Sequence, residues 1–498
     1  MKHTDIIRKL NLEQKCALLS GETVFTTRAL PGKGIPSITL SDGPNGVRKQ
    51  AGAADHLGLN PSVPATCFPT SSATACSWDE ALGEAVGEAL GEEAAAQEVA
   101  VLLGPGLNIQ RSPLCGRDFE YFSEDPILAG KMAAAYVRGI QKKGIAACPK
   151  HFAVNSQELR RMASDSVVDE RTLRELYLTG FEIVVKEARP KTIMTSYNLI
   201  NGTYANENAH LLQDILRKDW GFDGAVVTDW GGSNDHALGV KNGSTLEMPC
   251  PGGDSIRELM KAVKDGKVAE ADLDARLDEL LELVLSTHAA VEKAPRTFDA
   301  AAHHALARRA AAESIVLLKN EDGILPLKAG EKLAVIGDFA QTPRYQGAGS
   351  SAVNALQVDA LLDCIKAGDS GISFVGYASG FDRQGAADPK KQEEAVSLAK
   401  QADTVLLCLG LDELRESEGL DRADMALAEN QQQLLDAVAA VNPNVVVLLS
   451  AGAPVETPWV GRCKALVYGA LGGQAGAGAA ADILTGKLCP CGKLSQTW

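Results

Sequence analysis

Two acidic residues stand out as candidates for chemistry, and the first of them is Asp229. It directly follows the apolar run 225–228 and precedes Trp230. A carboxylate at the end of a buried strand, beside an indole, costs free energy unless it is paired or used in catalysis. The competing interpretation is a structural carboxylate that caps the next helix. The residues alone favour neither interpretation over the other.

The second candidate is Glu418, in the charged segment 416–422, which reads ESEGLDR. Such a segment is by default a solvated loop. Glu418 is distinguished by the flexible Gly419 that follows it and by the nearby charge pair of Asp421 and Arg422.

Further polar residues follow short apolar runs within residues 1–290. They are Asp42 after 38–40, Lys150 and His151 after 146–148, Tyr197 after 192–195, and Asp229 with Trp230 after 225–228. In barrels of parallel strands, side chains at the carboxyl ends of the strands converge on one mouth, where catalysis takes place. A polar residue that only marks a strand end would explain any one of these positions, but four in succession favour a shared site.

The runs alternate with helix-like segments at 78–97, 127–142, 170–186 and 211–218. Near-continuous apolar strands separated by helices indicate a parallel sheet that is covered on both faces. This alternation of strands and helices repeats over about 250 residues and predicts a (β/α)₈ TIM-type barrel, which we assign to residues 1–290. Glycine at positions 83, 87 and 91 of the first of these helices predicts a smooth face for close packing.

A second α/β unit is predicted for residues 311–498, after a linker at 291–310 that enters a helix. Its strands are expected at 333–337, 372–377, 404–410, 445–450 and 465–468. This pattern is typical of an open, mainly parallel α/β sandwich. Because Asp229 and Glu418 fall on different predicted domains, a site that uses both is expected at the domain junction.

Composition narrows the class of protein. The 498 residues are 45% hydrophobic, and 49 Lys and Arg against 64 Asp and Glu give a net charge of −15. High apolar content excludes disorder, and the acidic charge argues against a nucleic-acid or anionic-membrane partner. The polar N-terminus and the scattered cysteines predict a cytoplasmic protein without a membrane span. Cys489 and Cys491 are a close pair without further ligands nearby, so no metal site is predicted.

The sequence resembles glycoside hydrolase family 3, the β-glucosidase-type retaining exo-glycosidases. The similarity rests on segments that occur in family order over nearly the whole chain. These are SDGPNGVR (41–48), GRDFEYFSEDP (116–126), KHFAVNSQELRR (150–161), DERTLRELY (169–177), SYNLING (196–202), GFDGAVVTDW (221–230), LEMP (246–249), SIVLLKNEDGILPL (314–327) and ESEGLDR (416–422).

The resemblance implies that Asp229 is the nucleophile and Glu418 the acid/base. It also implies a set of residues around the first sugar, with Ser350 contributing from the second domain. Trp230 is added because an indole ring offers an apolar face to a sugar. The other members of this set are Asp42, Arg117, Lys150, His151, Arg161 and Tyr197. Such enzymes place their two carboxyl groups about 5–5.5 Å apart and need no cofactor. Cationic neighbours would keep Asp229 ionised, and a dry cleft with the Asp229 charge would keep Glu418 protonated.

The expected substrate is a small β-glucoside or oligosaccharide, cleaved at its non-reducing end. Asp42-Gly43-Pro44 resembles the glucosidase form of its motif, which favours glucosides over xylosides. The alternatives are a β-xylosidase, an α-L-arabinofuranosidase or a transglycosylase on the same scaffold and, remotely, a non-catalytic sugar-binding protein.

The sequence departs from the family pattern in two places. Thr245 stands where many relatives have aspartate, and the chain stops at Trp498, where many relatives continue. Those relatives add the rest of the second domain and a fibronectin-like third domain. The sequence is therefore a naturally short form, a fragment, or one piece of a longer molecule.

Overall fold

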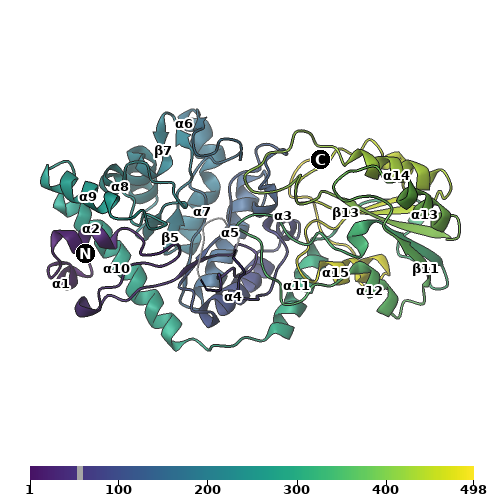
Figure 1. Cartoon of the computed structure of the whole chain (residues 1–498), viewed down its shortest axis with the longest axis horizontal. Coiled ribbons are helices and arrows are strands. Elements are labelled where there is room, and N and C mark those ends of the chain that lie inside the picture. Colours follow the sequence, from purple (N-terminus) through teal and green to yellow (C-terminus); the bar gives the residue numbers. More distant parts are fainter. Residues whose placement is uncertain (53–59) are drawn as a thin grey trace. The chain divides into compact units, whose positions relative to one another are not determined.

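The structure is a computed structural model that describes residues 1–52 and 60–498 (Figure 1). The chain forms two compact units. Unit 1 contains Met1–Ala65, Glu80–Ile109 and Asp125–Asp299, and unit 2 contains Thr66–Asp79, Gln110–Glu124 and Ala300–Trp498. The two units do not follow from a single cut of the chain near residue 290, because two short segments of that range pack with unit 2. One of them carries Arg117, which we had assigned to the barrel.

The four apolar runs named above, together with a fifth at 100–103, form five short parallel strands. These are β1 (Leu40–Asp42), β2 (Val101–Leu103), β3 (Ala146–Ala147), β5 (Thr192–Met194) and β8 (Ala225–Val227). They pair in the orders β1-β2-β3 and β5-β8. A parallel bridge between Phe152 and Thr195 joins these two groups.

Hydrogen bonds close these strands into a ring. Val227 bridges Leu246 in parallel, and Glu247 bridges Ser20 in parallel. Residues 25–27 then pair with 38–40, through the Leu40 amide donating to the Phe25 carbonyl at 2.8 Å. Residues 19–27 therefore close the barrel between the segment at 246–247 and β1.

Helices surround this ring, and a small sheet of order β4-β6-β7 lies beside it. The α-helices are α1 (Thr4–Ile7), α2 (Leu12–Leu18), α4 (Glu80–Ala96), α5 (Pro126–Gln141), α6 (Glu170–Thr172), α7 (Thr179–Ala188), α8 (His236–Asn242), α9 (Asp254–Lys264) and α10 (Glu270–Lys293). The π-helices are η3 (Leu173–Tyr177) and η5 (His210–Asp219), the 3₁₀-helices are η1 (Pro31–Lys33) and η4 (Ala205–Glu207), and the small sheet consists of β4 (Asp165–Ser166), β6 (Leu199–Ile200) and β7 (Thr203–Tyr204). Two of the predicted α-helices are thus partly or wholly π-helical.

The glycines of α4 allow it to approach α5 closely, as predicted. A Cβ atom on Gly87 would lie 2.5 Å from the Tyr136 carbonyl oxygen, and one on Gly91 would lie 2.5 Å from that of Ile140. Both obstacles are backbone atoms that no rotamer change can remove. The spacing of four residues is therefore a packing feature, which confirms the interpretation made from the sequence.

Unit 2 is built on a six-stranded sheet of order β11-β10-β12-β13-β14-β9. The strands are β9 (Val316–Asn320), β10 (Lys332–Ile336), β11 (Ser373–Ala378), β12 (Thr404–Gly410), β13 (Val445–Ser450) and β14 (Ala465–Tyr468). All five predicted strands are present and parallel, and β9 adds an antiparallel edge that we did not predict. Every residue of β12 is buried, whereas β9 is mostly half-exposed.

Helices cover both faces of this sheet (Figure 1). Helix α11 packs on α15, α15 packs on α12, and α13 packs on α14. The α-helices are α3 (Ser71–Ala75), α11 (Ala300–Ser314), α12 (Leu361–Ala367), α13 (Pro389–Ala399), α14 (Glu429–Ala439) and α15 (Gly476–Leu484), and the 3₁₀-helices are η2 (Asp118–Glu120), η6 (Glu321–Gly323), η7 (Asp338–Ala340) and η8 (Val460–Arg462). Only residues 294–299 of the predicted linker are non-helical, because α10 ends at Lys293 and α11 begins at Ala300.

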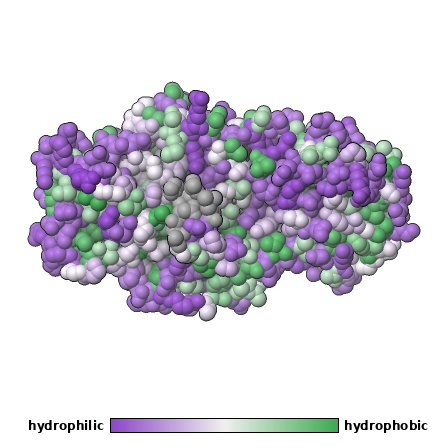
Figure 2. All heavy atoms as spheres, in the orientation of Figure 1, coloured by the Kyte–Doolittle hydropathy of each residue, from purple (hydrophilic) through white to green (hydrophobic). Residues whose placement is uncertain are grey.

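Figure 2 shows a face on which hydrophilic residues predominate and hydrophobic ones are scattered. Among the residues that the structure describes, no helix is long and apolar enough to cross a membrane.

We expect Gly87→Ala to destabilise unit 1, because the added methyl group must push the backbone of α5 away. Overpacking of this kind costs about 1–3 kcal/mol. Urea titration followed by circular dichroism would measure the loss. Gly32→Ala is the control, since a Cβ atom at Gly32 has nothing within 4 Å. Equal stability of the two variants would contradict close α4–α5 packing.

Candidate functional site

Asp229 lies at the carboxyl end of the barrel strand β8 and is 8% exposed. Its Oδ1 accepts a hydrogen bond from the Trp230 amide at 2.8 Å. The next helix, α8, is capped by Asp235, whose side chain accepts from the Leu238 amide. Asp229 therefore does not cap this helix, and the structural alternative left open by the sequence is wrong.

His151, one of the predicted site residues, has its side chain beside Asp229. Its Nε2 lies 3.6 Å from Asp229 Oδ2, and the residue is 1% exposed. The buried Asn108 fixes the His151 backbone, since its Oδ1 accepts from the His151 amide at 2.7 Å and its Nδ2 donates to the His151 carbonyl at 2.8 Å. Sequence reasoning missed Asn108, although it too follows an apolar run, 100–103.

Arg161, Tyr197 and Trp230 form a connected group. The Arg161 guanidinium lies 4.9 Å from the centre of the Tyr197 ring. The Tyr197 hydroxyl donates to the Trp230 carbonyl at 2.9 Å. Trp230 Nε1 in turn donates to the Val24 carbonyl at 2.7 Å. The aromatic residues that we predicted from strand ends are thus tied to the segment that closes the barrel.

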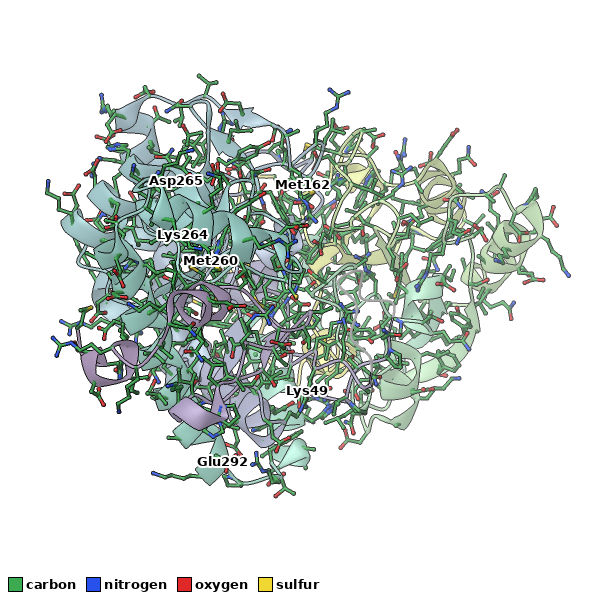
Figure 3. All side chains as sticks on the ribbon, turned by 60° about the vertical axis from the view of Figure 1, so that its left-hand side comes forward. Lys49, Met162, Met260, Lys264, Asp265 and Glu292 are labelled. Carbon is green, nitrogen blue, oxygen red and sulfur yellow. The ribbon has the colours of Figure 1, made fainter. Side chains whose placement is uncertain are left out.

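In the loop that carries Arg161, an acidic side chain is buried and two apolar side chains are exposed. The buried Glu158 accepts from Arg161 Nη1 at 2.7 Å. Leu159 and Met162, in contrast, are 63% and 54% exposed, and Figure 3 labels Met162. Glu158, which sequence reasoning did not single out, holds Arg161 on the side where Tyr197 lies.

The remaining candidates of unit 1 lie at the same end of the barrel, after the carboxyl ends of their strands. Asp42 ends β1, where its carbonyl accepts from the Arg48 amide at 2.9 Å. The buried Lys150 and His151 follow β3, whose extension runs parallel to residue 106. Since these strands are parallel, the structure brings together at one end of unit 1 all of its predicted site residues.

Glu207 anchors the segment that follows Trp230. Its Oε1 accepts from the amides of Asn234 and Asp235 at 3.0 and 2.7 Å. Burial raises the pKa of Glu207, although these two donors act in the opposite direction. No sequence signal distinguished this residue from other loop acids.

Glu418 lies in unit 2, and its carboxylate has two sets of partners. Its Oε2 accepts from the Ser350 amide at 2.7 Å and from the Ser350 hydroxyl at 2.5 Å, while Arg117 Nη1 lies 3.6 Å from Oε1. We predicted Ser350 and Arg117 as sugar contacts. The structure places both on the carboxylate of Glu418, and their contact with sugar stays a prediction.

The segment 416–422 is buried at both ends, although its charges suggested a solvated loop. Glu416 is 0% and Arg422 7% exposed. The Arg422 amide donates to the Leu114 carbonyl at 2.7 Å, and a Cβ atom on Gly116 would lie 1.7 Å from the Leu420 carbonyl oxygen. The backbone at 114–116 therefore lies directly against this segment and has room only for glycine at position 116.

Comparisons with known proteins show the family of the chain. Residues 53–283 match the family model described as "Glycosyl hydrolase family 3 N terminal domain", and residues 315–498 match "Glycosyl hydrolase family 3 C-terminal domain". A solved structure, the "GH3 beta-glucosidase" of Bifidobacterium adolescentis, is 44% identical with a TM-score of 0.93, and the match covers 99% of this chain and 70% of that one. The chain belongs to glycosyl hydrolase family 3. The fold of this family, a TIM-type barrel followed by an α/β sandwich, confirms the predicted fold class.

Two curated relatives are similarly close. "Thermostable beta-glucosidase B" of Acetivibrio thermocellus is 47% identical over 99% of the chain and 65% of its own length. "Exo-alpha-(1->6)-L-arabinopyranosidase" of Bifidobacterium longum is 45% identical over 99% of the chain and 66% of its own length. The chain thus spans slightly less than two thirds of each of these relatives.

The buried carboxyl group of Asp118, next to Arg117, makes the stability of the protein depend on pH. Asp118 is 1% exposed, and its pKa lies well above the ordinary value, first because burial disfavours the charge and next because Glu416 repels it. Arg422 and the Cys115 thiol act in the opposite direction. The folded protein therefore keeps a proton that the unfolded chain releases above about pH 4. The stability that this proton contributes is complete below that pH and is lost as the pH rises.

We expect the free energy of unfolding of Asp118→Asn to increase relative to that of the parent protein as the pH rises above about 4, because asparagine cannot ionise. Urea titrations at several pH values would measure the difference, with the exposed Asp369→Asn as control. A difference that is independent of pH, or that falls with pH, would contradict a protonated Asp118.

Proposed function

We propose that the protein is a retaining, exo-acting β-glucosidase that removes terminal non-reducing β-D-glucosyl residues through a covalent glycosyl-enzyme. The observation that carries this proposal is the environment of Asp229. It is a nearly buried carboxylate at a barrel strand end that caps no helix and has His151 beside it. The similarity to named β-glucosidases supports the choice of substrate.

In the first step, Asp229 attacks the anomeric carbon of the sugar. A bond forms between this carbon and a carboxylate oxygen, while the bond to the leaving oxygen breaks. Glu418 donates its proton to that oxygen, so the aglycone departs as a neutral alcohol. The chemistry requires the two carboxyl groups to approach opposite faces of one sugar, about 5–5.5 Å apart.

In the second step, the sugar leaves the enzyme. Glu418, now a carboxylate, removes a proton from water, and the water oxygen attacks the anomeric carbon. The ester bond to Asp229 breaks, which restores both carboxyl groups. Two inversions at the same carbon give net retention, and no cofactor takes part.

The remaining predicted residues bind and orient the sugar. Asp42 accepts hydrogen bonds from the distal hydroxyls, and Trp230 packs against the apolar face of the ring. Lys150, His151, Arg161 and Tyr197 supply donors to the other hydroxyls. A buried acceptor that loses its hydroxyl partner is penalised strongly, so Asp42 favours substrates that carry these hydroxyls.

We expect Asp229→Ala to lose at least about 10³-fold in kcat on an activated aryl β-glucoside, because no ester can form. Asp235→Asn is the control, since it removes a carboxylate charge six residues further along but keeps a side chain that can cap α8. Turnover of Asp229→Ala near the parent rate would contradict the nucleophile.

Glu418→Ala tests the second half of the same proposal. On an activated aryl β-glucoside this variant should accumulate the glycosyl-enzyme, because water is no longer deprotonated. Azide needs no deprotonation, and it should restore turnover and give β-glucosyl azide. The configuration of the product, measured by NMR, decides the outcome, and an α-configured azide or an unimpaired variant would overturn the mechanism.

An exo-α-L-arabinopyranosidase is the second candidate, because a relative of that name is nearly as similar as the β-glucosidase. An arabinopyranoside lacks the hydroxymethyl group of glucose and carries its 4-hydroxyl in the axial position. Rates on p-nitrophenyl β-D-glucoside, α-L-arabinopyranoside, β-D-xyloside and α-L-arabinofuranoside would decide between these activities. We expect the highest kcat/KM on the glucoside, and a higher value on any other substrate would correct the proposal.

A further inference from the structure

Glu416, two residues before Glu418, is a fully buried carboxylate with a defined set of partners. It is 0% exposed, and both of its carboxylate oxygens lie 3.0 Å from the Gly452 amide that donates to them. Burial raises its pKa, and Arg344 is the first of the groups that oppose this shift. Arg344 Nη2 lies 3.8 Å from Glu416 Oε2.

Arg344 is also buried, and its guanidinium donates to three backbone carbonyls. Nε donates to Gln346 at 2.8 Å, Nη1 to Leu411 at 3.3 Å and Nη2 to Glu416 at 3.0 Å. Leu411 directly follows β12, so one side chain ties the exit of this strand to the start of the segment 416–422. It also ties both to its own loop, 344–350.

These two loops are the ones that hold Glu418. The Glu418 amide donates to the Ala348 carbonyl at 3.0 Å, and Ser350 donates twice to the Glu418 carboxylate. A Cβ atom on Gly349 would lie 2.4 Å from the Glu418 Cβ. A small shift of one loop against the other would therefore separate Ser350 from Glu418.

The surroundings leave little room for other arrangements. A Cβ atom on Gly452 would lie 2.3 Å from the Phe119 Cβ and 3.0 Å from Glu416 Oε1. Burying an arginine and a glutamate together is seldom a gain over apolar residues of the same volume. The pair does, however, fix both loops through directed hydrogen bonds, which apolar side chains cannot do.

We infer that Arg344 and Glu416 are positioning residues that act through Glu418, by keeping its carboxyl group aligned with Ser350 for proton transfer to the leaving group. The inference rests on the proposed function, since it needs Glu418 to be the acid. The inference predicts how the rate of cleavage depends on the leaving group. Damage to this pair must slow the cleavage of substrates whose leaving group needs a proton, and must spare substrates whose leaving group does not.

The experiment compares kcat/KM on two β-glucosides, which reports the steps up to bond cleavage. Phenol is a leaving group that benefits from a proton, and 2,4-dinitrophenolate departs without one. For Glu416→Gln we expect a loss of about 10–100-fold on the phenyl glucoside and less than about 3-fold on the dinitrophenyl glucoside. Glu456→Gln is the matched control, because Glu456 is an exposed glutamate of unit 2 that lies four residues after Gly452.

The outcomes separate the inference from the function on which it rests. Glu418→Ala is the benchmark, and if it shows no difference between the two substrates, the acid role of Glu418 is wrong. If Glu418→Ala shows the difference but Glu416→Gln loses equally on both substrates, or loses nothing, the positioning role is wrong. Arg344→Lys keeps the buried positive charge but loses the guanidinium that donates to three carbonyls, so this variant must show the same selective loss. It replaces Glu416→Gln in the experiment if the Glu416→Gln variant does not fold.

Discussion

The cost of burying carboxylates governs how the loops of both units are built. Four of the buried acids have donors of their own: Glu207 has two loop amides, Glu158 has Arg161, Glu120 has Arg117, and Glu416 has Gly452. Without such donors, ionised groups of this kind would be expelled or would take up a proton. Each set of donors also fixes a backbone segment, so the loops at the barrel mouth and around Glu418 are held by the acids that they bury.

The strand ends were predictable from the sequence because their signal is local. Apolar runs followed by a polar residue placed Asp42, His151, Tyr197 and Asp229, and parallel pairing then brought them to one end of the barrel. Whether Asp229 caps the next helix could not be decided from the sequence, because the answer depends on where α8 begins. The edge strand β9 was not predicted although residues 315–318 form a continuous apolar run, because an antiparallel edge strand does not follow from the alternation of parallel strands and helices.

The supporting residues were not predictable in this way. Asn108, Glu158, Glu207 and Glu416 matter through partners distant in the sequence, and a loop acid that anchors an amide looks like any solvated one. Gly116 shows the same limit, because its need for glycine arises from a carbonyl about three hundred residues away. The family resemblance did mark the segments at 116–126 and 416–422, but it did not indicate that they lie against each other.

The contact between Ser350 and Glu418 has a consequence for the proposed mechanism. An amide can only donate, and it therefore favours the ionised carboxylate that the second step requires. A hydroxyl can donate or accept, so Ser350 Oγ can accept from a protonated Glu418 before the substrate binds and donate to the carboxylate that forms once the proton has passed to the leaving group. Since Arg344 and Glu416 hold the backbone on both sides of this contact, the hydroxyl can reverse its role by rotation alone. A rigid frame around one rotatable donor thus suits a carboxyl group that must work in both protonation states.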